Sequence, residues 1–208
     1  MAEIKPDALY GAVLAAGRGL RFGGGKLHAS FHGRPLLFHV LEVVRQARDR
    51  GILQHAVVVI GTDDPDALRL VEAARLEPVL NAAPQLGLSH SLRLALRSAT
   101  SSGERHVRAL MVFLGDQPLV RLETVAALRD ASILHPGKVV RPVYQARPDV
   151  PGHPVVLDRS VWPLVESIEG DQGYGGGGVT IPLEGDNPDV NTPLDLRVLE
   201  DSQGCAPL

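Results

Sequence analysis

Glycines and cations crowd one short stretch near the N-terminus. An apolar run that includes Val13–Ala16 leads into residues 17–26, which contain five glycines together with Arg18, Arg21 and Lys26. Glycine lets backbone N–H groups approach an anion closely, and the cations neutralise charge that backbone dipoles alone cannot hold. The spacing departs from a Walker A loop and from the dinucleotide fingerprint, whose third glycine falls on Phe22. We interpret the stretch as a phosphate-binding loop of a third kind; the alternative is a flexible, solvated glycine loop.

Oxygen-bearing side chains later in the chain have the chemistry of a metal site. Asp116 follows the apolar run Val107–Leu114, and Asp189 and Asn191 share one face of an extended segment because they are two residues apart. Mg²⁺ takes hard oxygen ligands and bridges phosphates. We therefore expect Asp116 to hold Mg²⁺ with one or both of the later residues. The alternative for Asp116 is an Asx turn or a helix N-cap.

Three further features have both a functional and a plain interpretation. Ser89 and Ser91 open a helical pattern, where they either contact a base or phosphate or act as N-caps. His153 lies in a proline-glycine turn and either contacts substrate or is structural. The glycine-rich segment 170–178 is either a lid or a connector.

A parallel sheet with helices would bring these residues to one edge. Apolar runs at 10–16, 56–60, 78–81 and 107–114 predict strands, and helical spacing predicts helices between and after them: from Pro35 to about Arg50, after Asp64, from Ser89 on, and around Val125 and Leu128. This alternation is typical of a doubly wound α/β sheet, which binds ligands at the carboxyl ends of its strands.

The second half of the chain has a different pattern. Residues 139–144 and 153–157 predict two antiparallel strands, followed by a short helix near 160–168, a strand at 179–181 and a last helix capped by Thr192. We expect one domain over residues 1–208, with a nucleotide-binding half at about 8–134 and an acceptor-binding half at about 135–200.

Composition excludes several classes of protein. The chain has 208 residues and a formal net charge of −3, which argues against a generic nucleic-acid binder. No apolar run approaches the length of a membrane helix, and the first residues lack the apolar core of a signal peptide. A single cysteine, Cys205, agrees with a reducing compartment. We expect a cytoplasmic protein that binds neither membrane nor nucleic acid.

Six blocks in order along the chain together resemble the MobA-like nucleotidyltransferases, and within them they are most similar to the molybdenum cofactor cytidylyltransferases. The blocks are Leu14–Lys26, Gly33–Leu37, Gly87–Leu92, Leu114–Pro118, Gly152–Pro154 and Asp189–Pro193.

The resemblance implies a fold and a reaction. The fold would be a Rossmann-like, three-layer α/β nucleotidyltransferase fold with a mostly parallel sheet and a small β-rich substrate lobe. The reaction would transfer CMP from CTP to the terminal phosphate of Mo-molybdopterin, with release of pyrophosphate and Mg²⁺ as cofactor. A molybdoenzyme would be a possible client of the product.

The resemblance also assigns roles to single residues. Catalysis would fall to Lys26, Arg18, Arg21 and Asp116, the metal to Asp116, Asn191 and Asp189, and the acceptor to His153 and Asp171. Nucleotide binding would use Leu14, Ala15, Ala16, Gly17, Arg18, Gly19, Lys26, Asn81, Gly87, Leu88, Ser89 and Ser91. Related guanylyltransferases have glycine at the position of Ala16, so its methyl group favours cytosine over a larger purine.

A segment outside these six blocks departs from the family pattern. The family's Gly-Asp-x-Gly-Ala-Arg continues here as Tyr174-Gly175, so its arginine is absent. Two alternatives follow: another MobA-like nucleotidyltransferase, using GTP or a different phosphorylated acceptor, and a non-catalytic chaperone that delivers finished cofactor to a molybdoenzyme.

Overall fold

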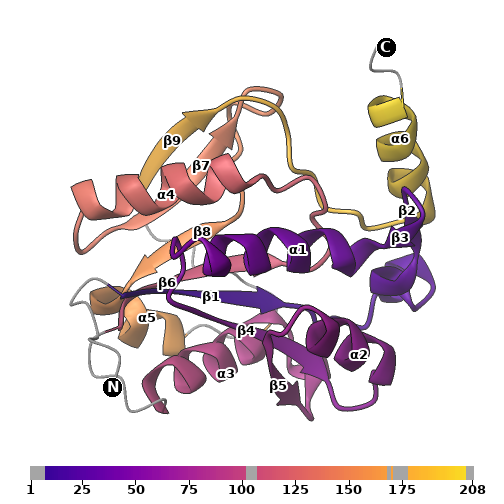
Figure 1. The fold of residues 1–208 in the computed structure, drawn as a ribbon, viewed down its shortest axis with the longest axis horizontal. Helices are drawn as coiled ribbons and strands as arrows, with labels where there is room; N and C mark the ends of the chain where they lie inside the picture. The colour runs from indigo at the N-terminus through magenta and orange to yellow at the C-terminus, as the bar shows by residue number, and fades with distance from the viewer. Residues whose placement is uncertain (1–7, 102–106, 168–169, 171–177, 205–208) are drawn as a thin grey trace.

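A single mixed sheet forms the centre of the molecule (Figure 1). The computed structural model of the chain describes residues 8–101, 107–167, 170 and 178–204. Within them the sheet has seven strands in the order β5-β4-β1-β6-β8-β7-β9. The strands are β1 (Ala8–Leu14), β4 (His55–Gly61), β5 (Glu77–Asn81), β6 (Val107–Leu114), β7 (Val139–Tyr144), β8 (Val155–Asp158) and β9 (Val179–Leu183).

Strand directions set the ligand edge of this sheet. β1 pairs in parallel with both β4 and β6, β4 with β5, and β7 with β9, whereas β8 runs antiparallel to β6 and β7. The chain runs outward from β1 to β4 and β5 and then returns to β6 on the other side of β1. This reversal of strand order beside β1 creates a crevice at the carboxyl ends of β1 and β6.

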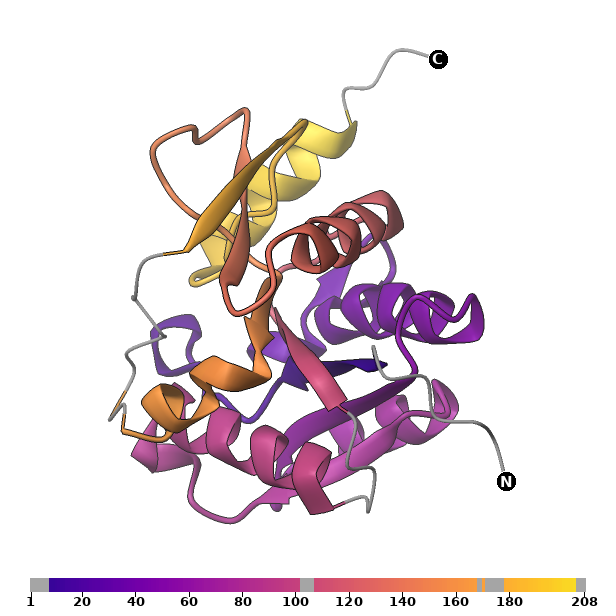
Figure 2. The same cartoon turned by 90° about the vertical axis from the view of Figure 1, so that its left-hand side faces the viewer.

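Helices cover both faces of the sheet, as Figures 1 and 2 show from two directions. Apolar side chains of α1 (Leu36–Asp49), α2 (Pro65–Ala73) and α4 (Leu122–Leu134) pack on one face. Those of α3 (Leu88–Ser101) and α5 (Trp162–Glu166) pack on the other. The three-layer, mostly parallel α/β fold predicted from the sequence is confirmed.

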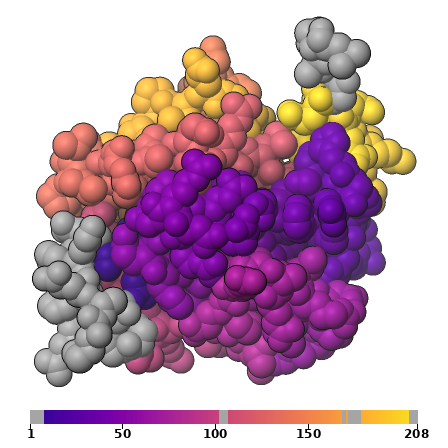
Figure 3. Space-filling view, in the orientation of Figure 1, coloured from indigo at the N-terminus to yellow at the C-terminus, as the bar shows by residue number. Residues whose placement is uncertain are grey.

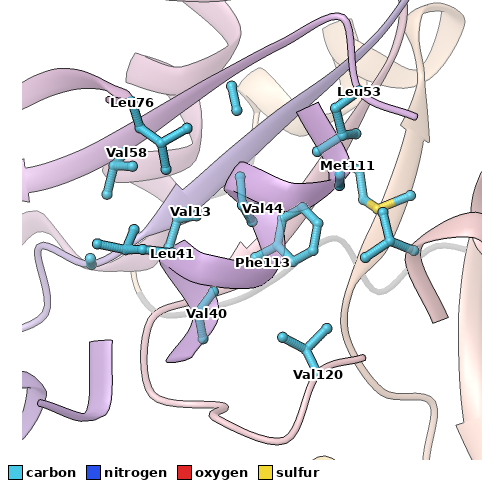
Figure 4. Packing of buried hydrophobic residues seen from close by; sticks show 14 of the residues in the cluster. Val13, Val40, Leu41, Val44, Leu53, Val58, Leu76, Met111, Phe113 and Val120 are labelled. Carbon is cyan, nitrogen blue, oxygen red and sulfur yellow. The ribbon is translucent and has the colours of Figure 1, made fainter. Parts of the chain in front are cut away.

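Side chains that alternate along β1 contribute to the hydrophobic cores on both faces of the sheet. Val13 meets Val40, Leu41 and Val44 of α1 on one face (Figure 4), whereas Tyr10 and Leu14 join the core under α3. Figure 3 shows α1 and α4 side by side on the surface of the helical layer that they form with α2. Because β1 is buried along its whole length, the loop that follows it starts from a rigid base.

A third, smaller core packs residues just before and at the start of α1 against the last helix and the segment before it. The hairpin of β2 (Ser30–Phe31) and β3 (Arg34–Pro35) packs Phe31 against Val190 and Leu196, the latter on the last helix, α6 (Pro193–Gly204). Pro35 therefore precedes α1 in a short strand, and the expectation that it starts the helix was wrong. The predicted Thr192 cap is confirmed, because its hydroxyl accepts the Asp195 N–H at 3.2 Å.

Two short stretches of 3₁₀ helix, η1 (Leu20–Phe22) and η2 (Lys26–His28), occupy the loop after β1, and a third, η3 (Pro84–Leu86), follows β5. A fourth, η4 (Arg159–Val161), leads into α5, so the helix expected near 160–168 begins as 3₁₀. Trp162 of α5 is 6% exposed and donates its indole N–H to the Leu157 carbonyl. In the described part of the chain, no helix has both the length and the apolar character needed to cross a membrane.

Candidate active site

The loop after β1 leaves the sheet between its two parallel neighbours. Ala15 donates its N–H to the Val59 carbonyl at 2.8 Å, and the Leu14 carbonyl accepts the Gly115 N–H at 3.0 Å. Gly19 has φ 60° and lies so close to Lys26 that an added Cβ would sit 3.0 Å from the lysine Cβ. Glycine is therefore required there for the loop to fold back on itself and bring Lys26 to the start of the loop.

A cleft of about 640 Å³ opens at this carboxyl edge. Four separate segments of the chain line it. They are residues 14–21 and 26–27 at the end of β1 and in the loop after it, residues 84–85, 87–88 and 91 from the connection after β5 into the first turn of α3, residues 114 and 116 at the end of β6, and residues 189 and 191 before α6. The crevice expected from the strand order is thus walled by the segments that carry the predicted phosphate loop, base-side residues and metal ligands.

Lys26 and Asp116 form an ion pair inside the cleft. The lysine Nζ lies 2.5 Å from the Asp116 Oδ2, and the two side chains are 13% and 18% exposed. Partial burial strengthens the attraction between such charges relative to water. Arg18 and Arg21 are exposed at the cleft, and neither forms an ion pair with any residue in the described ranges.

Backbone and side-chain hydrogen bonds tie the segment before α6 to the turn after β6. Val190 donates its N–H to the Asp116 carbonyl at 3.1 Å, and the Gln117 side-chain amide donates to the Asp189 Oδ1 at 2.5 Å. The Asp195 carboxylate accepts the backbone N–H groups of Asn191 and Thr192, which lower its pKa. Asp116, Asp189 and Asn191 are therefore held together at the cleft.

A buried polar network stands behind these residues. Asn187, 1% exposed, donates to the Gln117 Oε1 at 3.4 Å and to the His153 carbonyl at 3.3 Å. The His153 carbonyl also accepts the Tyr144 hydroxyl at 2.7 Å, and burial raises the pKa of Tyr144 to about 12. The network connects β7 and the turn around His153 to the turn that carries Asp116.

The His153 imidazole is held neutral. Burial, together with the positive charge of Arg141, lowers its pKa to about 4, although the negative charge of Asp116 opposes the shift. His153 does not belong to the cleft lining.

The donor set at the cleft fits a hard divalent cation. Asp116 Oδ2 is held by Lys26 and Asp189 Oδ1 by Gln117, and for the other oxygen of each carboxylate no donor is found among the described residues. The Asn191 side chain adds an amide oxygen at the same wall. Such oxygens suit Mg²⁺ or Mn²⁺. A cluster of three or more His, Cys, Asp or Glu residues is absent from the described ranges.

The base-side residues separate into two groups. Gly87, Leu88 and Ser91 line the cleft, whereas Ser89 and Asn81 do not. Ser89 donates its backbone N–H to the Gly170 carbonyl, and its buried hydroxyl finds no hydrogen-bond partner in the described part of the protein. Asn81 donates to the Ser91 hydroxyl at 3.0 Å. Neither serine therefore has the geometry of an N-cap for α3.

Sequence reasoning missed several residues of this site. Leu20, Leu27, Leu114, Pro84 and Gln85 also line the cleft. Gln117 and Asn187 lie behind it, and each is two residues or fewer from a predicted ligand, which is the signal that could have found them. Asp171 and the Tyr174-Gly175 departure lie outside the described residues, so their predicted roles stay predictions.

Comparisons with known proteins converge on nucleotide transfer. Residues 11–178 match the model of the MobA-like NTP transferase domain. The chain is similar to the bifunctional protein GlmU of Azorhizobium caulinodans, with 38% identity over 128 residues, which cover 59% of this chain and 26% of the relative. It is also similar to a probable molybdenum cofactor guanylyltransferase of Thermococcus kodakarensis, with 41% identity over 61 residues and 29% of each chain. The matched residues thus cover less than a third of each of these two relatives.

Among solved structures, the chain is similar to Rv0371c from Mycobacterium tuberculosis, with a TM-score of 0.74 and 26% identity over 95% of this chain and 100% of that one. A complex of Rv0371c with manganese gives a TM-score of 0.71 at 24% identity, covering 94% and 98%.

Proposed function

Because this chain belongs to the MobA-like NTP transferase domain family, we propose that it is a molybdenum cofactor cytidylyltransferase, which transfers CMP from CTP to the terminal phosphate of Mo-molybdopterin. The observation that carries the proposal is the cleft itself. A glycine loop with three cations, a partly buried Lys26–Asp116 pair and the Asp189–Asn191 segment face one another across it.

The reaction requires positioning and charge neutralisation. An oxygen of the acceptor phosphate forms a bond to the α-phosphorus of CTP, the bond from that phosphorus to the bridging oxygen breaks, and pyrophosphate leaves with the electron pair. The acceptor phosphate is largely ionised near neutral pH, so no strong general base is needed. Preorganised cations and N–H groups supply the main stabilisation.

The cations of the loop divide this work by their positions. Arg18 and Arg21 are exposed at the mouth and make no ion pair with a described residue, so they are available to hold the β- and γ-phosphates. Lys26 is less exposed and lies opposite Asp116, where it would stabilise the charge that grows around the α-phosphorus.

Asp116 and Asn191, with Asp189 beside them, would hold Mg²⁺. When bound, the cation would neutralise phosphate charge and bring acceptor and nucleotide together. Support comes from the oxygen donor set described above and from the manganese complex of the similar protein Rv0371c.

Ala16 supports cytosine as the base. Its side chain is 7% exposed, packs in the core beneath α3 and lines the cleft. A methyl group at this wall narrows the space for a purine, a difference worth about 1–3 kcal/mol in discrimination.

A second candidate is a guanylyltransferase that acts on the same acceptor. The local similarity to the probable guanylyltransferase of Thermococcus kodakarensis favours it. For both candidate functions, we propose that His153 and Asp171 help to bind the acceptor. His153 would do so from its place in the hydrogen-bond network behind Asp116.

A pyrophosphate-release assay tests the proposal. Purified protein is incubated with Mg²⁺, molybdenum-loaded molybdopterin and CTP, GTP or ATP in turn. The proposal predicts release that depends on the acceptor and is fastest with CTP. Lys26→Ala should lower the rate by about 100-fold or more with an unchanged circular dichroism spectrum, and Asp116→Ala should abolish the Mg²⁺-dependent activity. Equal release without acceptor would contradict it.

A further inference from the structure

Ser91 and Asn81 form a hydrogen-bonded pair of unequal exposure to the cleft. Ser91, in the first turn of α3, is 5% exposed and lines the cleft. Asn81, the last residue of β5, is 0% exposed and lies behind it. Its side-chain amide nitrogen lies 3.0 Å from the Ser91 hydroxyl oxygen.

The backbone fixes which way the Asn81 amide points. Its Oδ1 accepts the Ala83 N–H at 2.8 Å. A backbone N–H only donates, so the amide oxygen must face Ala83 and the NH₂ group must face Ser91. The orientation of this amide therefore follows from its hydrogen bonds.

This orientation determines what Ser91 offers to a ligand. The NH₂ group of Asn81 has only hydrogens to give, so the Ser91 oxygen accepts in this bond. The hydroxyl hydrogen is left to be donated elsewhere, and no residue in the described ranges is found to accept it. Ser91 thus presents a hydrogen-bond donor at the wall of the cleft.

We propose that Asn81 is a positioning residue for base selection, which holds Ser91 as a donor so that the cleft favours a nucleobase presenting an acceptor atom there, a carbonyl oxygen or an unprotonated ring nitrogen. The inference rests on the proposed nucleotide-binding function. It moves Asn81 from a direct nucleotide contact to a role that acts through Ser91.

Asn81→Asp tests this polarity with little change in shape. One carboxylate oxygen still accepts the Ala83 N–H, and the other replaces the NH₂ donor by an acceptor. The Ser91 hydroxyl then donates to residue 81 and turns a lone pair to the cleft. We expect CTP affinity, measured by isothermal titration calorimetry at pH 8.5 without acceptor substrate, to fall about tenfold.

A double-mutant cycle with Ser91→Ala separates positioning from a general structural effect. Ser91→Ala alone should weaken CTP binding, and adding Asn81→Asp to it should cause no further loss. Thermal melting follows the folded fraction of each variant. If Asn81→Asp does not fold, Asn81→Leu takes its place in the same cycle, with a smaller expected loss of about threefold that again requires Ser91.

An Asn81 substitution that costs the same CTP affinity in the wild-type background and in the Ser91→Ala background would overturn the inference, because the effect would then not pass through the hydroxyl. If the losses of CTP affinity add in this way and the wild-type protein still binds CTP, the proposed function is unaffected. A wild-type protein that binds no nucleoside triphosphate would overturn both.

Discussion

The ammonium group of Lys26 lies 2.5 Å from the carboxylate of Asp116, across 90 positions of the chain. Lys26 comes from the glycine loop after β1, and Asp116 comes from the turn after the neighbouring strand β6. Lys26, the proposed catalytic cation, therefore binds one carboxylate oxygen of Asp116, the proposed metal ligand. A divalent cation and Lys26 compete for the same carboxylate, and nucleotide phosphates would draw the lysine away from it.

Lys26→Met should strengthen the binding of Mn²⁺ in the absence of nucleotide, by about tenfold, because it frees the Asp116 Oδ2 and removes a nearby positive charge. Titration of Mn²⁺ followed by electron paramagnetic resonance measures the free ion directly. Arg21→Met is the matched control, since it removes a cation of the same loop that does not contact Asp116. Unchanged Mn²⁺ affinity in Lys26→Met would remove this competition from the account.

Ala16→Gly should shift nucleotide preference toward GTP. Removing the methyl group leaves more room in the cleft for a purine base. A change of about 1–3 kcal/mol in discrimination corresponds to a roughly tenfold or greater fall in the ratio of kcat/KM for CTP to kcat/KM for GTP. Both nucleotides are compared in the pyrophosphate-release assay.

Ala15→Gly provides the matched control for Ala16→Gly. The Ala15 side chain also lines the cleft, but it packs in the core beneath α1, on the opposite face of the sheet from Ala16. It should lower stability without altering the CTP/GTP ratio. If both substitutions change the ratio alike, Ala16 has no specific role in base choice.

His153 should make the protein less stable in mild acid. Its pKa is about 4 in the folded protein and 6.5 in the unfolded chain, so the unfolded chain binds more protons between these values. Stability from this group is complete above pH 6.5 and is lost as pH falls toward 4. Between pH 7.5 and 5 the loss is about 1–2 kcal/mol.

Urea denaturation of wild type and His153→Gln at the two pH values checks this effect. The variant should lose less stability than wild type over this range, where most carboxylates stay ionised. His135→Gln, which removes an exposed histidine at the end of α4, is the comparison variant. An identical loss in wild type and His153→Gln would show that His153 is not held neutral.

The sequence predicts the first half of the fold because its signals are local. The β-branched run Ala56–Ile60 stops at Gly61, and Asp64 caps α2 by accepting the Ala67 N–H at 2.9 Å. Once the strands are parallel, their carboxyl ends meet at one edge, so the glycine loop and Asp116 had to lie close together.

Other features depend on long-range pairing and could not be predicted from local pattern. The placement of β8 beside β6 is set by pairs of residues more than 40 positions apart in the chain. Asn81 at the end of a strand has the same sequence signature whether it faces the cleft or the core behind it. Its 0% exposure and its bond to Ser91 are visible only in the folded chain.

The most direct test of the central claim is the identity of the covalent product. CTP labelled at the α-phosphate is incubated with the protein, Mg²⁺ and molybdenum-loaded molybdopterin, and the product is identified by chromatography and mass spectrometry. A labelled pterin dinucleotide that contains cytosine should form in equal amount to pyrophosphate, and Lys26→Ala should form it more slowly by about 100-fold or more. Label that remains in CTP, or a dinucleotide formed only from GTP, would contradict it.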